Sequence, residues 1–333
     1  MKPILVTGAA GFVGLNVTRV LATRGHRVVA LDHRSPDQPV YRFLAGVADR
    51  VAWVRGDVRD SLSILQLLRA HGVGRIVHAA AVTATRPDWE QERAADLFAV
   101  NLLGTIATLQ AAKTAEADRV ILVSSGAAVG FGPPDQPVPE EAPATPTELY
   151  GISKYAAERA AIRLRELLDL DIIIVRMAQP YGPMERPSPD RAALSPIAEW
   201  VESVAAGRPI ETPTLDGARD WIYVEDVADA YARLVEAEGL RHVLYNLGPG
   251  ADVPVREVLD AIRRAWPRAE VVVREELAAN PNLAAHRRRG PLEVQRLADE
   301  LKFQPRFDIT SGIARYCRWI DAGRGAPGKD LGP

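Results

Sequence analysis

Two residues near the middle of the chain have the types and the spacing needed for proton transfer. Tyr150 and Lys154 stand four residues apart in the segment Leu149-Tyr-Gly-Ile-Ser-Lys-Tyr155. Positions i and i+4 share one face of a helix, so the ammonium group is expected beside the phenol. A free tyrosine has a pKa of about 10, and a cation about 4 Å away contributes roughly 4 kcal/mol at an effective dielectric near 20, enough to lower that pKa by about two to three. An isolated pair of this kind is usually a surface Tyr and Lys, so its meaning depends on the elements that position it.

A glycine-rich segment at the start of the chain supplies such a context. Gly8, Gly11 and Gly14 follow a predicted strand and lie at the start of a predicted helix, whose first two residues are Phe12 and Val13. In this setting the first glycine permits a tight turn, the second lets the backbone approach a pyrophosphate, and the third lets the helix pack on the sheet. The helix N-terminus presents free N–H groups and a positive dipole to the phosphates. The segment therefore predicts a dinucleotide site, although three spaced glycines by themselves would equally fit a plain turn.

Two carboxylates refine this prediction. Asp32 ends the second predicted strand, about 20 residues past the glycines, where a carboxylate can accept both ribose hydroxyls. A 2′-phosphate there would meet negative charge, so NAD is favoured over NADP, and Arg34 could partly reverse this preference. Asp57 and Val58 follow the third predicted strand. Asp57 is placed either to reach the adenine or to cap the next helix, and the spacing leaves both roles open.

Composition limits the classes of protein that the chain can represent. Of its 333 residues 47% are hydrophobic and 25% are charged, and the net charge of -2 gives no field that would attract nucleic acid or acidic membranes. The lone cysteine, Cys317, excludes an intramolecular disulfide and disfavours a cysteine-ligated metal site. No run of about 18 apolar residues and no signal peptide is visible. We expect a cytoplasmic protein without a metal site.

The first 177 residues alternate short apolar runs with helical patterns, which predicts an α/β fold. The expected strands are Pro3–Val6, Arg27–Leu31, Val51–Val54, Arg75–His78, Arg119–Val123 and Asp171–Val175. The expected helices are Phe12–Arg24, Ser61–Ala70, Glu90–Ala115 and Leu149–Leu168. Right-handed βαβ crossovers then give a Rossmann-type, doubly wound parallel sheet covered on both faces.

In the second half of the chain the regular alternation of strands and helices stops, and prolines mark irregular connections. Helical patterns occur at Leu194–Ala206, Glu225–Glu236, Val255–Ala265 and Glu293–Leu301, and short strands are expected at Trp221–Tyr223 and His242–Asn246. We expect an NAD-binding domain over residues 1–176, with residues 207–248 partly woven back into it. Residues 177–206 and 249–322 should form a smaller, interwoven α/β substrate-binding cap, followed by a flexible tail at 323–333.

With these residues assembled, the chain resembles the extended short-chain dehydrogenase/reductase family, in its NAD-dependent epimerase/dehydratase group. The resemblance covers about residues 3 to 320 and depends on an ordered series of short motifs. They are Thr7–Gly14, Gly56-Asp57, His78-Ala79-Ala80-Ala81, Val100-Asn101 with Gly104-Thr105, Val123-Ser124-Ser125, Tyr150–Lys154, Tyr181-Gly-Pro183, Arg219–Asp226 and Tyr245–Gly248. The resemblance implies that Tyr150 is the general acid/base while hydride passes to or from nicotinamide. It also implies cofactor contacts at Ala79, Ala80, Ala81, Asn101 and Ser124.

The third catalytic member departs from the family pattern. A Ser or Thr usually stands three residues before the valine of a Val-Tyr-Gly segment, and here Gly126 takes that place before Val129. Ser125 is our choice for the role, with Ser124 second. Sugar-nucleotide 4,6-dehydratases of the family place an Asp-Glu pair directly after that Ser or Thr, whereas this chain has Ala127 and Ala128. Dehydration by that route is therefore not expected.

Two substrate classes remain open. A nucleotide-sugar epimerase or reductase working through a 4-keto sugar is favoured by Arg219, which matches a pyrophosphate-binding arginine of the family, and Arg288 within Arg287–Arg289 is a second candidate phosphate ligand. An NAD-dependent dehydrogenase of a free sugar, uronate or aldonate is favoured by Gln179, which stands where the family has asparagine, and by the shortened turn at Thr214–Gly217. A segment resembling that of uronate dehydrogenases surrounds Gly126. We favour the nucleotide-sugar class.

Two further expectations concern turnover and assembly. A redox-sensing regulator that lost turnover would need neither Tyr150 nor Lys154, so their presence favours an enzyme. The helices expected at Glu90–Ala115 and Leu149–Leu168 are rich in alanine. Because family members pair these helices across a dimer interface, we expect a homodimer.

Overall fold

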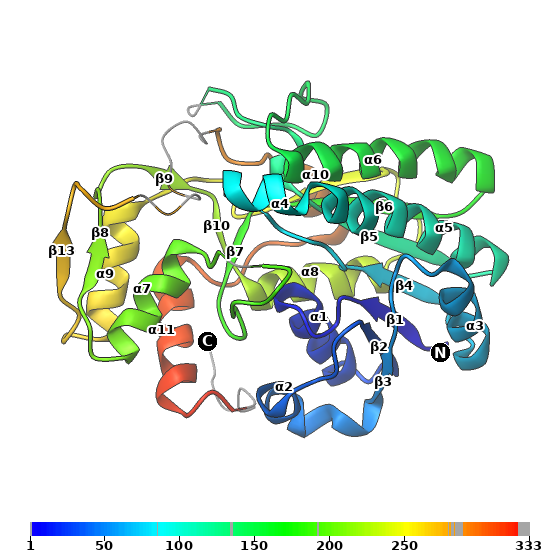
Figure 1. The fold of residues 1–333 in the computed structure, drawn as a ribbon, viewed down its shortest axis with the longest axis horizontal. Helices are drawn as coiled ribbons and strands as arrows, with labels where there is room; N and C mark the ends of the chain where they lie inside the picture. The colour runs from blue at the N-terminus through cyan, green and yellow to red at the C-terminus, as the bar shows by residue number, and fades with distance from the viewer. Residues whose placement is uncertain are drawn as a thin grey trace.

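A seven-stranded parallel sheet forms the centre of the molecule (Figure 1). The computed structural model describes residues 2–84, 86–133, 136–191, 193–278, 280, 283 and 289–325. In the order β11-β6-β5-β4-β1-β2-β3, the direction of winding reverses between β1 and β4, which is where doubly wound sheets open a crevice for ligands. The strands are β1 (Ile4–Thr7), β2 (Val28–Asp32), β3 (Val51–Arg55), β4 (Arg75–His78), β5 (Arg119–Ser125), β6 (Ile172–Met177) and β11 (Leu244–Leu247). The Rossmann-type fold class predicted from sequence is confirmed.

The sheet is buried because its strands are apolar on both faces. All residues of β1 and β2 are buried, and β1 lies between its neighbours with Ile4 opposite both Val28 and Arg75. The strand ends differ from the prediction by up to two residues. The difference has a consequence at β5, which continues to Ser125 and so carries Ser124 and Ser125 to the edge where the crevice opens.

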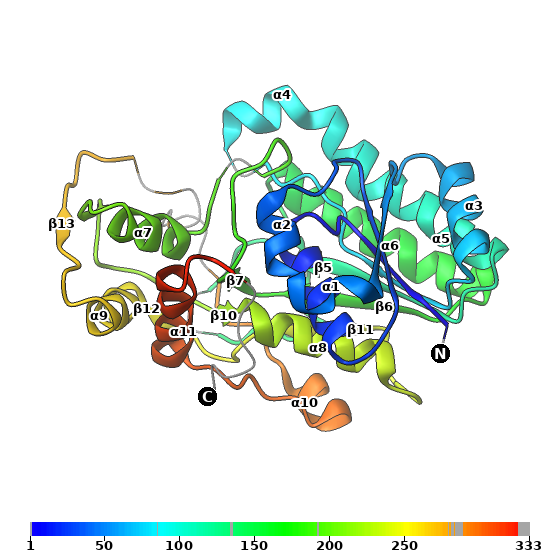
Figure 2. The same cartoon turned by 90° about the horizontal axis from the view of Figure 1, so that it is seen from below.

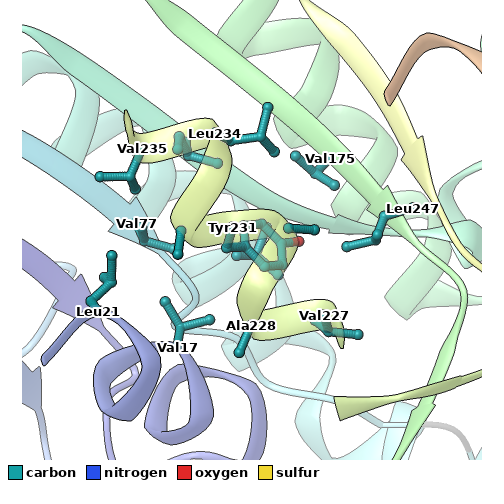
Figure 3. Close-up of a cluster of buried hydrophobic side chains, with 14 of the residues drawn as sticks. Val17, Leu21, Val77, Val175, Val227, Ala228, Tyr231, Leu234, Val235 and Leu247 are labelled. Atoms are coloured by element: carbon teal, nitrogen blue, oxygen red, sulfur yellow. The ribbon is translucent and has the colours of Figure 1, made fainter. Parts of the chain in front are cut away.

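Helices cover both faces of the sheet. One face packs against α1 (Phe12–Thr23) and α8 (Val224–Glu236), the other against α3 (Ser61–His71), α5 (Gly104–Thr114) and α6 (Leu149–Leu168). Figure 3 shows Tyr231 of α8 among side chains from the strands and from α1, including Val77, Val175 and Leu21. These side chains are almost fully buried, so α8 packs closely on the sheet that supports the glycine loop.

The helix expected at Glu90–Ala115 is present as one helical stretch, Pro87–Thr114, but it starts earlier and contains a π turn that was not predicted. The chain forms α4 (Pro87–Phe98), then a π-helical turn η2 (Ala99–Leu103), then α5. Proline at the first helical position fixes the earlier start. The π turn inserts an extra residue, and its Asn101 turns inward and is buried. In the described residues, Pro87–Thr114 is the one stretch long and apolar enough to cross a membrane, and 44% of its most apolar part is buried in this fold.

The second half builds a smaller cap beside the sheet (Figure 2). Its helices are α7 (Pro196–Ala205), α9 (Val255–Ala265) and α11 (Ile309–Asp321), which share one apolar core. The two-stranded ribbons of this half of the chain are β8 (Ile210–Thr212) with β13 (Val271–Val273), β9 (Ala218–Arg219) with β12 (Val253–Pro254), and β7 (Gln179–Tyr181) with β10 (Trp221–Tyr223). Helix α11 was not predicted from sequence. Helix α10 (Gln295–Leu301), which the prediction assigned to the cap, lies against β11 instead.

The remaining short elements are α2 (Gln38–Phe43), η1 (Ala45–Arg50) and the 3-10 turn η3 (Gly126–Ala128). Phe43 of α2 is buried, and its ring centroid lies 6.5 Å from that of Trp319 in α11. This edge-to-face contact joins the N-terminal half of the chain, here called the nucleotide half, to the cap. The predicted flexible tail lies mostly outside the described residues, beyond Gly325.

Candidate active site

The carboxyl ends of the central strands open into a cavity of about 450 Å³. Most of the residues that the sequence assigned to cofactor binding line this one cavity. They are Gly8, Gly11, Phe12, Val13, Gly14, Asp32, Arg34, Asp57, Val58, Ala79, Ala80, Ala81, Ser124, Tyr150 and Lys154. The fold thus brings together segments that are far apart in the sequence.

The glycine loop forms a cradle in which side chains do not fit. Gly8 has φ +64°, and a Cβ on it would lie 2.7 Å from the Cα of Ala80, so the turn after β1 touches the end of β4. A Cβ on Gly14 would overlap the carbonyl oxygen of Gly8. Gly11 is the N-cap of α1 and makes no side-chain cap, which leaves the first N–H groups of the helix to a ligand. These features fit the pyrophosphate of a dinucleotide.

Asp32 is fixed in position by the backbone around it. Its Oδ2 accepts a hydrogen bond from the N–H of Ala10 at 2.9 Å, and its Oδ1 accepts one from the N–H of Arg34 at 3.0 Å. The side chain of Arg34 lies beside the same carboxylate, with Nε 3.6 Å from Oδ1. The carboxylate therefore faces the cavity with a set orientation, and a neighbouring guanidinium is partly neutralised by it.

Asp57 does not cap the helix that follows it. Asp60 is the N-cap of α3 and accepts a hydrogen bond from the N–H of Ser63 at 3.0 Å. Asp57 instead forms a forked ion pair with Arg59, and the hydrogen bonds from this guanidinium lower the pKa of Asp57. Of the two roles that the spacing left open, the cap is excluded, and the carboxylate remains beside the cavity.

Tyr150 lies in the first turn of α6, and its hydroxyl lies near polar side chains from three other parts of the chain. Burial raises the pKa of Tyr150, while hydrogen bonds with Ser125 and Thr83 and the positive charge of Arg191 act in the opposite direction. Lys154 is one turn further along α6, and its Nζ donates to the carbonyl oxygen of Val123 at 2.6 Å. Burial lowers the pKa of Lys154 to about 8, opposed by the negative charge of Glu158.

The two serines at the end of β5 point to different neighbours. Ser125 hydrogen-bonds to Tyr150 and accepts a hydrogen bond from the N–H of Ala127 at 3.2 Å. Ser124 donates to Glu158 at 2.5 Å, and Glu158 is held in a buried ion pair with Arg176 at 2.8 Å. The hydrogen bond to Tyr150 favours Ser125 as the third member of the catalytic set, whereas Ser124, which lines the cavity, is tied to the buried Glu158–Arg176 pair.

Asn101 is placed by the π turn to hold the cavity wall. Its Oδ1 accepts a hydrogen bond from the N–H of Val82 at 2.9 Å, and its Nδ2 donates to the carbonyl oxygen of Val82 and to Ser153 Oγ at 3.0 and 2.9 Å. Its amide therefore joins the end of β4 to α6, and it is not among the cavity-lining residues. The prediction that Asn101 contacts the cofactor is therefore replaced by an indirect role, in which Asn101 holds Val82 in the cavity wall.

The predicted substrate residues that the structure describes lie outside this cavity. Gln179 is in β7, where it pairs with Trp221, and Arg219 is buried in β9, where its Nη1 donates to the carbonyl oxygen of Ala218 at 2.7 Å. Arg288 lies outside the described residues. Arg289 is described, and its guanidinium pairs with Asp220 at 2.8 Å.

The same guanidinium fills the space beside Gly126. A Cβ at that position would overlap Arg289, so glycine at the place of the usual Ser or Thr leaves room for it.

Sequence analysis missed a segment that runs across the cavity. Residues 182–195, here called the strap, connect β7 to α7, and the structure describes all of them except residue 192. The strap contributes Met184, Arg186 and residues 187–191 to the cavity lining. It is tied to the nucleotide half by Asn16 Nδ2 to Pro183 O at 3.0 Å and by Arg186 to Asp37 at 2.8 Å. The only sequence signal was a crowd of prolines, which indicates an irregular connection but not where it goes.

Comparisons with known proteins agree with this geometry. The model of the NAD dependent epimerase/dehydratase family matches residues 4–248. A UDP-glucose 4-epimerase of Mycolicibacterium smegmatis is 31% identical over 318 residues, covering 93% of this chain and 96% of that protein. A dTDP-glucose 4,6-dehydratase of Xanthomonas campestris pv. campestris is 28% identical over 337 residues, covering 96% and 93%.

A solved structure is similar over the whole length. The UDP-glucose 4-epimerase of Thermus thermophilus in complex with NAD has a TM-score of 0.80 at 25% identity, covering 96% of this chain and 99% of that one. The glycine cradle, Asp32 and the Tyr150–Lys154 pair line one cavity, in agreement with these matches. The chain therefore belongs to the NAD-dependent epimerase/dehydratase family of extended short-chain dehydrogenases/reductases.

Proposed function

We propose that the protein is an NAD-dependent epimerase of a nucleotide-sugar, with Tyr150 as its acid/base group. The observation that carries the proposal is that Tyr150, Lys154 and the glycine cradle line the same cavity. The M. smegmatis relative, which shares nearly the full length of the chain, is named as a UDP-glucose 4-epimerase, and this favours a nucleotide-sugar over a free sugar acid.

The residues of the chain divide the binding of NAD between them. The glycine cradle and the N-terminus of α1 would hold the pyrophosphate, and Asp32 would accept the ribose hydroxyls. Because Asp32 is oriented by two backbone N–H groups, it presents its charge where a 2′-phosphate would lie, which favours NAD over NADP. When bound, NAD supplies a reversible hydride acceptor.

The acid/base cycle then follows from Tyr150. Its phenolate would take the proton of the sugar hydroxyl as the C–H bond on the same carbon breaks, with bound NAD as the acceptor of the hydride, which leaves a keto sugar. Ser125, hydrogen-bonded to Tyr150, is placed to hold the reacting oxygen. If the same hydride returned to the opposite face of the ketone, Tyr150 would give back the proton, and the epimer would form with no net oxidation.

We further propose that the protein does not dehydrate its substrate by the route of the family's dehydratases, because neither of the two positions after Gly126 carries an acid. The turn η3 has Ala127 and Ala128 where the family's dehydratases carry Asp and Glu, and Ala128 is fully buried. Relatives of both activities match the chain, so this part of the proposal depends on those two alanines.

The proposal is tested by product analysis with NAD and a panel of sugars. UDP-glucose, UDP-glucuronate, dTDP-glucose and a free uronate are each incubated with the protein, and the products are resolved by chromatography and NMR. We expect a C4 epimer without accumulation of NADH, and a loss of about 10²- to 10⁴-fold in rate for Tyr150→Phe. Stoichiometric NADH with a free uronate would replace the proposal by a dehydrogenase, and a 4-keto-6-deoxy product would show that the alanines do not prevent dehydration.

A further inference from the structure

Arg191 on the strap lies in the cavity beside the predicted acid/base group. It lines the cavity together with Tyr150 and Lys154, and its Cζ is 5.5 Å from the ring centroid of Phe12 at the start of α1. Arg191 also forms a β-bridge with Thr83, whose side chain hydrogen-bonds to Tyr150. A residue from the strap is thereby brought next to the phenol from α6.

The strap holds Arg191 in one place through several contacts. Its Nη2 pairs with Glu185 at 2.5 Å, and the Glu185 side chain is fully buried, accepting hydrogen bonds from Ser195 N at 2.7 Å and Ser195 Oγ at 2.8 Å. The backbone N–H groups of Arg191 and Ser188 donate to each other's carbonyl oxygens at 3.0 and 2.9 Å. Before Glu185, Met184 has φ +69°, a left-handed conformation that is unfavourable for a residue other than glycine. Such a conformation persists because the surrounding contacts fix it.

Part of the Arg191 guanidinium is not used by these contacts. Its Nε is buried and has no hydrogen-bond partner within the part of the chain that the structure describes. A buried donor without a partner is costly, so it calls for an explanation such as a bound water, an ion or a catalytic role. The pair with Glu185 therefore orients the guanidinium without satisfying all of it.

Charged and titratable groups reach the surroundings of Tyr150 from five elements. They are Lys154 and Glu158 of α6, His78 of β4, Tyr231 of α8, Arg93 and Asp96 of α4, and Glu185, Asp190 and Arg191 of the strap. Several of these are already paired: Asp190 lies 3.6 Å from Arg93, and Glu158 is bound by Arg176. Burial lowers the pKa of His78 to about 3, so His78 carries no charge at neutral pH.

We propose that Arg191 is a positioning residue that acts through Tyr150, as a second cation that favours the phenolate. The inference rests on the proposed function, because it requires Tyr150 to be the acid/base group. The sequence motif places both Tyr150 and Lys154 on α6. The inference adds a positive charge from the strap, which belongs to the cap half of the chain.

The physical basis is the balance between burial and charge at the phenol. Burial raises the pKa of Tyr150, and a phenol that stays protonated cannot take a proton from the substrate. Lys154 donates to the carbonyl of Val123, so its position is fixed by the backbone of β5. Arg191 is always protonated, so its contribution persists above the pKa of Lys154, about 8.

The test is a pH titration of Tyr150 by NMR in the full chain with NAD added, using ¹³C label on the carbon that bears the hydroxyl. The Tyr150→Phe variant identifies the signal. We expect Arg191→Met to raise the pKa of Tyr150 by about 1, Arg191→Lys to leave it near that of the wild type, and Glu185→Gln to lower it, since Gln removes the compensating negative charge. Arg163→Met on the exposed face of α6, where Arg163 pairs with Glu166, is the matched control and should leave the titration unchanged.

The two variants that break the Arg191–Glu185 pair separate the possible roles. If Arg191 only ties down the strap, Arg191→Met and Glu185→Gln loosen the same contact and move the titration in the same direction. Opposite directions support the second cation, and equal directions, or no change in Arg191→Met, would overturn it. The titration requires no turnover, so a failure of the proposed epimerase activity is recognised separately, by the absence of product.

Discussion

At the scale of single residues, the site depends on side chains whose orientation is set by backbone groups. Asp32 is the clearest example, because Ala10 and Arg34 each donate an N–H to one of its carboxylate oxygens. A carboxylate held in this way would bind the ribose hydroxyls without first having to be ordered. The preference for NAD over NADP that we propose would then be a property of one charge in a fixed place.

Replacing this carboxylate gives a direct prediction. We expect Asp32→Ala to weaken NAD binding by about 10- to 100-fold, since a hydrogen bond to a charged group contributes roughly 1.5–3 kcal/mol, and to weaken NADP binding much less. Calorimetric titration with both cofactors measures the difference. Asp49→Ala, in η1 and away from the cavity lining, is the control and should bind both as the wild type does. An equal loss for the two cofactors would contradict the ribose assignment.

At the scale of elements, the interruption of the long helix by a π turn is what connects the cavity wall to α6. The turn directs Asn101 inward, where three hydrogen bonds join Val82 to Ser153. Val82 lines the cavity, and Ser153 lies between Tyr150 and Lys154 in sequence. The π turn thus sets the distance between the cofactor side of the cavity and the helix that carries the acid/base pair.

Removing the amide should affect stability and cofactor binding together. We expect Asn101→Ala to lower the free energy of unfolding by about 2–3 kcal/mol, because it leaves the buried N–H of Val82 without its acceptor, and to raise the KM for NAD. Urea unfolding and initial rates measure the two effects. Gln110→Ala, at an exposed position of α5, serves as the control. A loss below about 0.5 kcal/mol would show that water or a shifted backbone replaces the amide.

At the scale of the whole molecule, one layer of helices leaves large apolar side chains on the surface. Leu103, at the junction of η2 and α5, is 58% exposed, and Leu167, near the end of α6, is 61% exposed. Helices α5 and α6 pack side by side on the same face of the sheet. Their exposed leucines fit the homodimer that we propose, in which these two helices meet their copies in a partner.

The homodimer can be tested by a single change on this layer. We expect the wild-type chain to be dimeric at micromolar concentration by light scattering, and Leu103→Glu to shift it to the monomer mass, because a charge buried across an apolar interface costs several kcal/mol. Leu62→Glu is the matched control, since Leu62 of α3 is 70% exposed and lies outside α5 and α6. A monomeric wild type, or equal dissociation in the control variant, would rule out this interface.

The sequence by itself determined the parts of the protein that depend on local pattern. Apolar runs and turn glycines specify buried parallel strands and the loop between β1 and α1, and the predicted bounds of α6 and α9 agree with the structure. The spacing of Tyr150 and Lys154 determines that they share a helix face whatever that helix packs against. Helix α11 was missed, and so was the π turn inside the helix expected at Glu90–Ala115, because neither the cap core nor the inward turn of Asn101 is set by local pattern.

Only the tertiary structure decided which distant groups meet. That Ser125 rather than Ser124 contacts Tyr150 follows from the direction in which β5 ends. Arg191 was unpredictable, because the strap shares no motif with Tyr150 and reaches it only across the cavity. Long-range contacts of this kind are selected by the packing of whole elements, and no short stretch of residues contains that information.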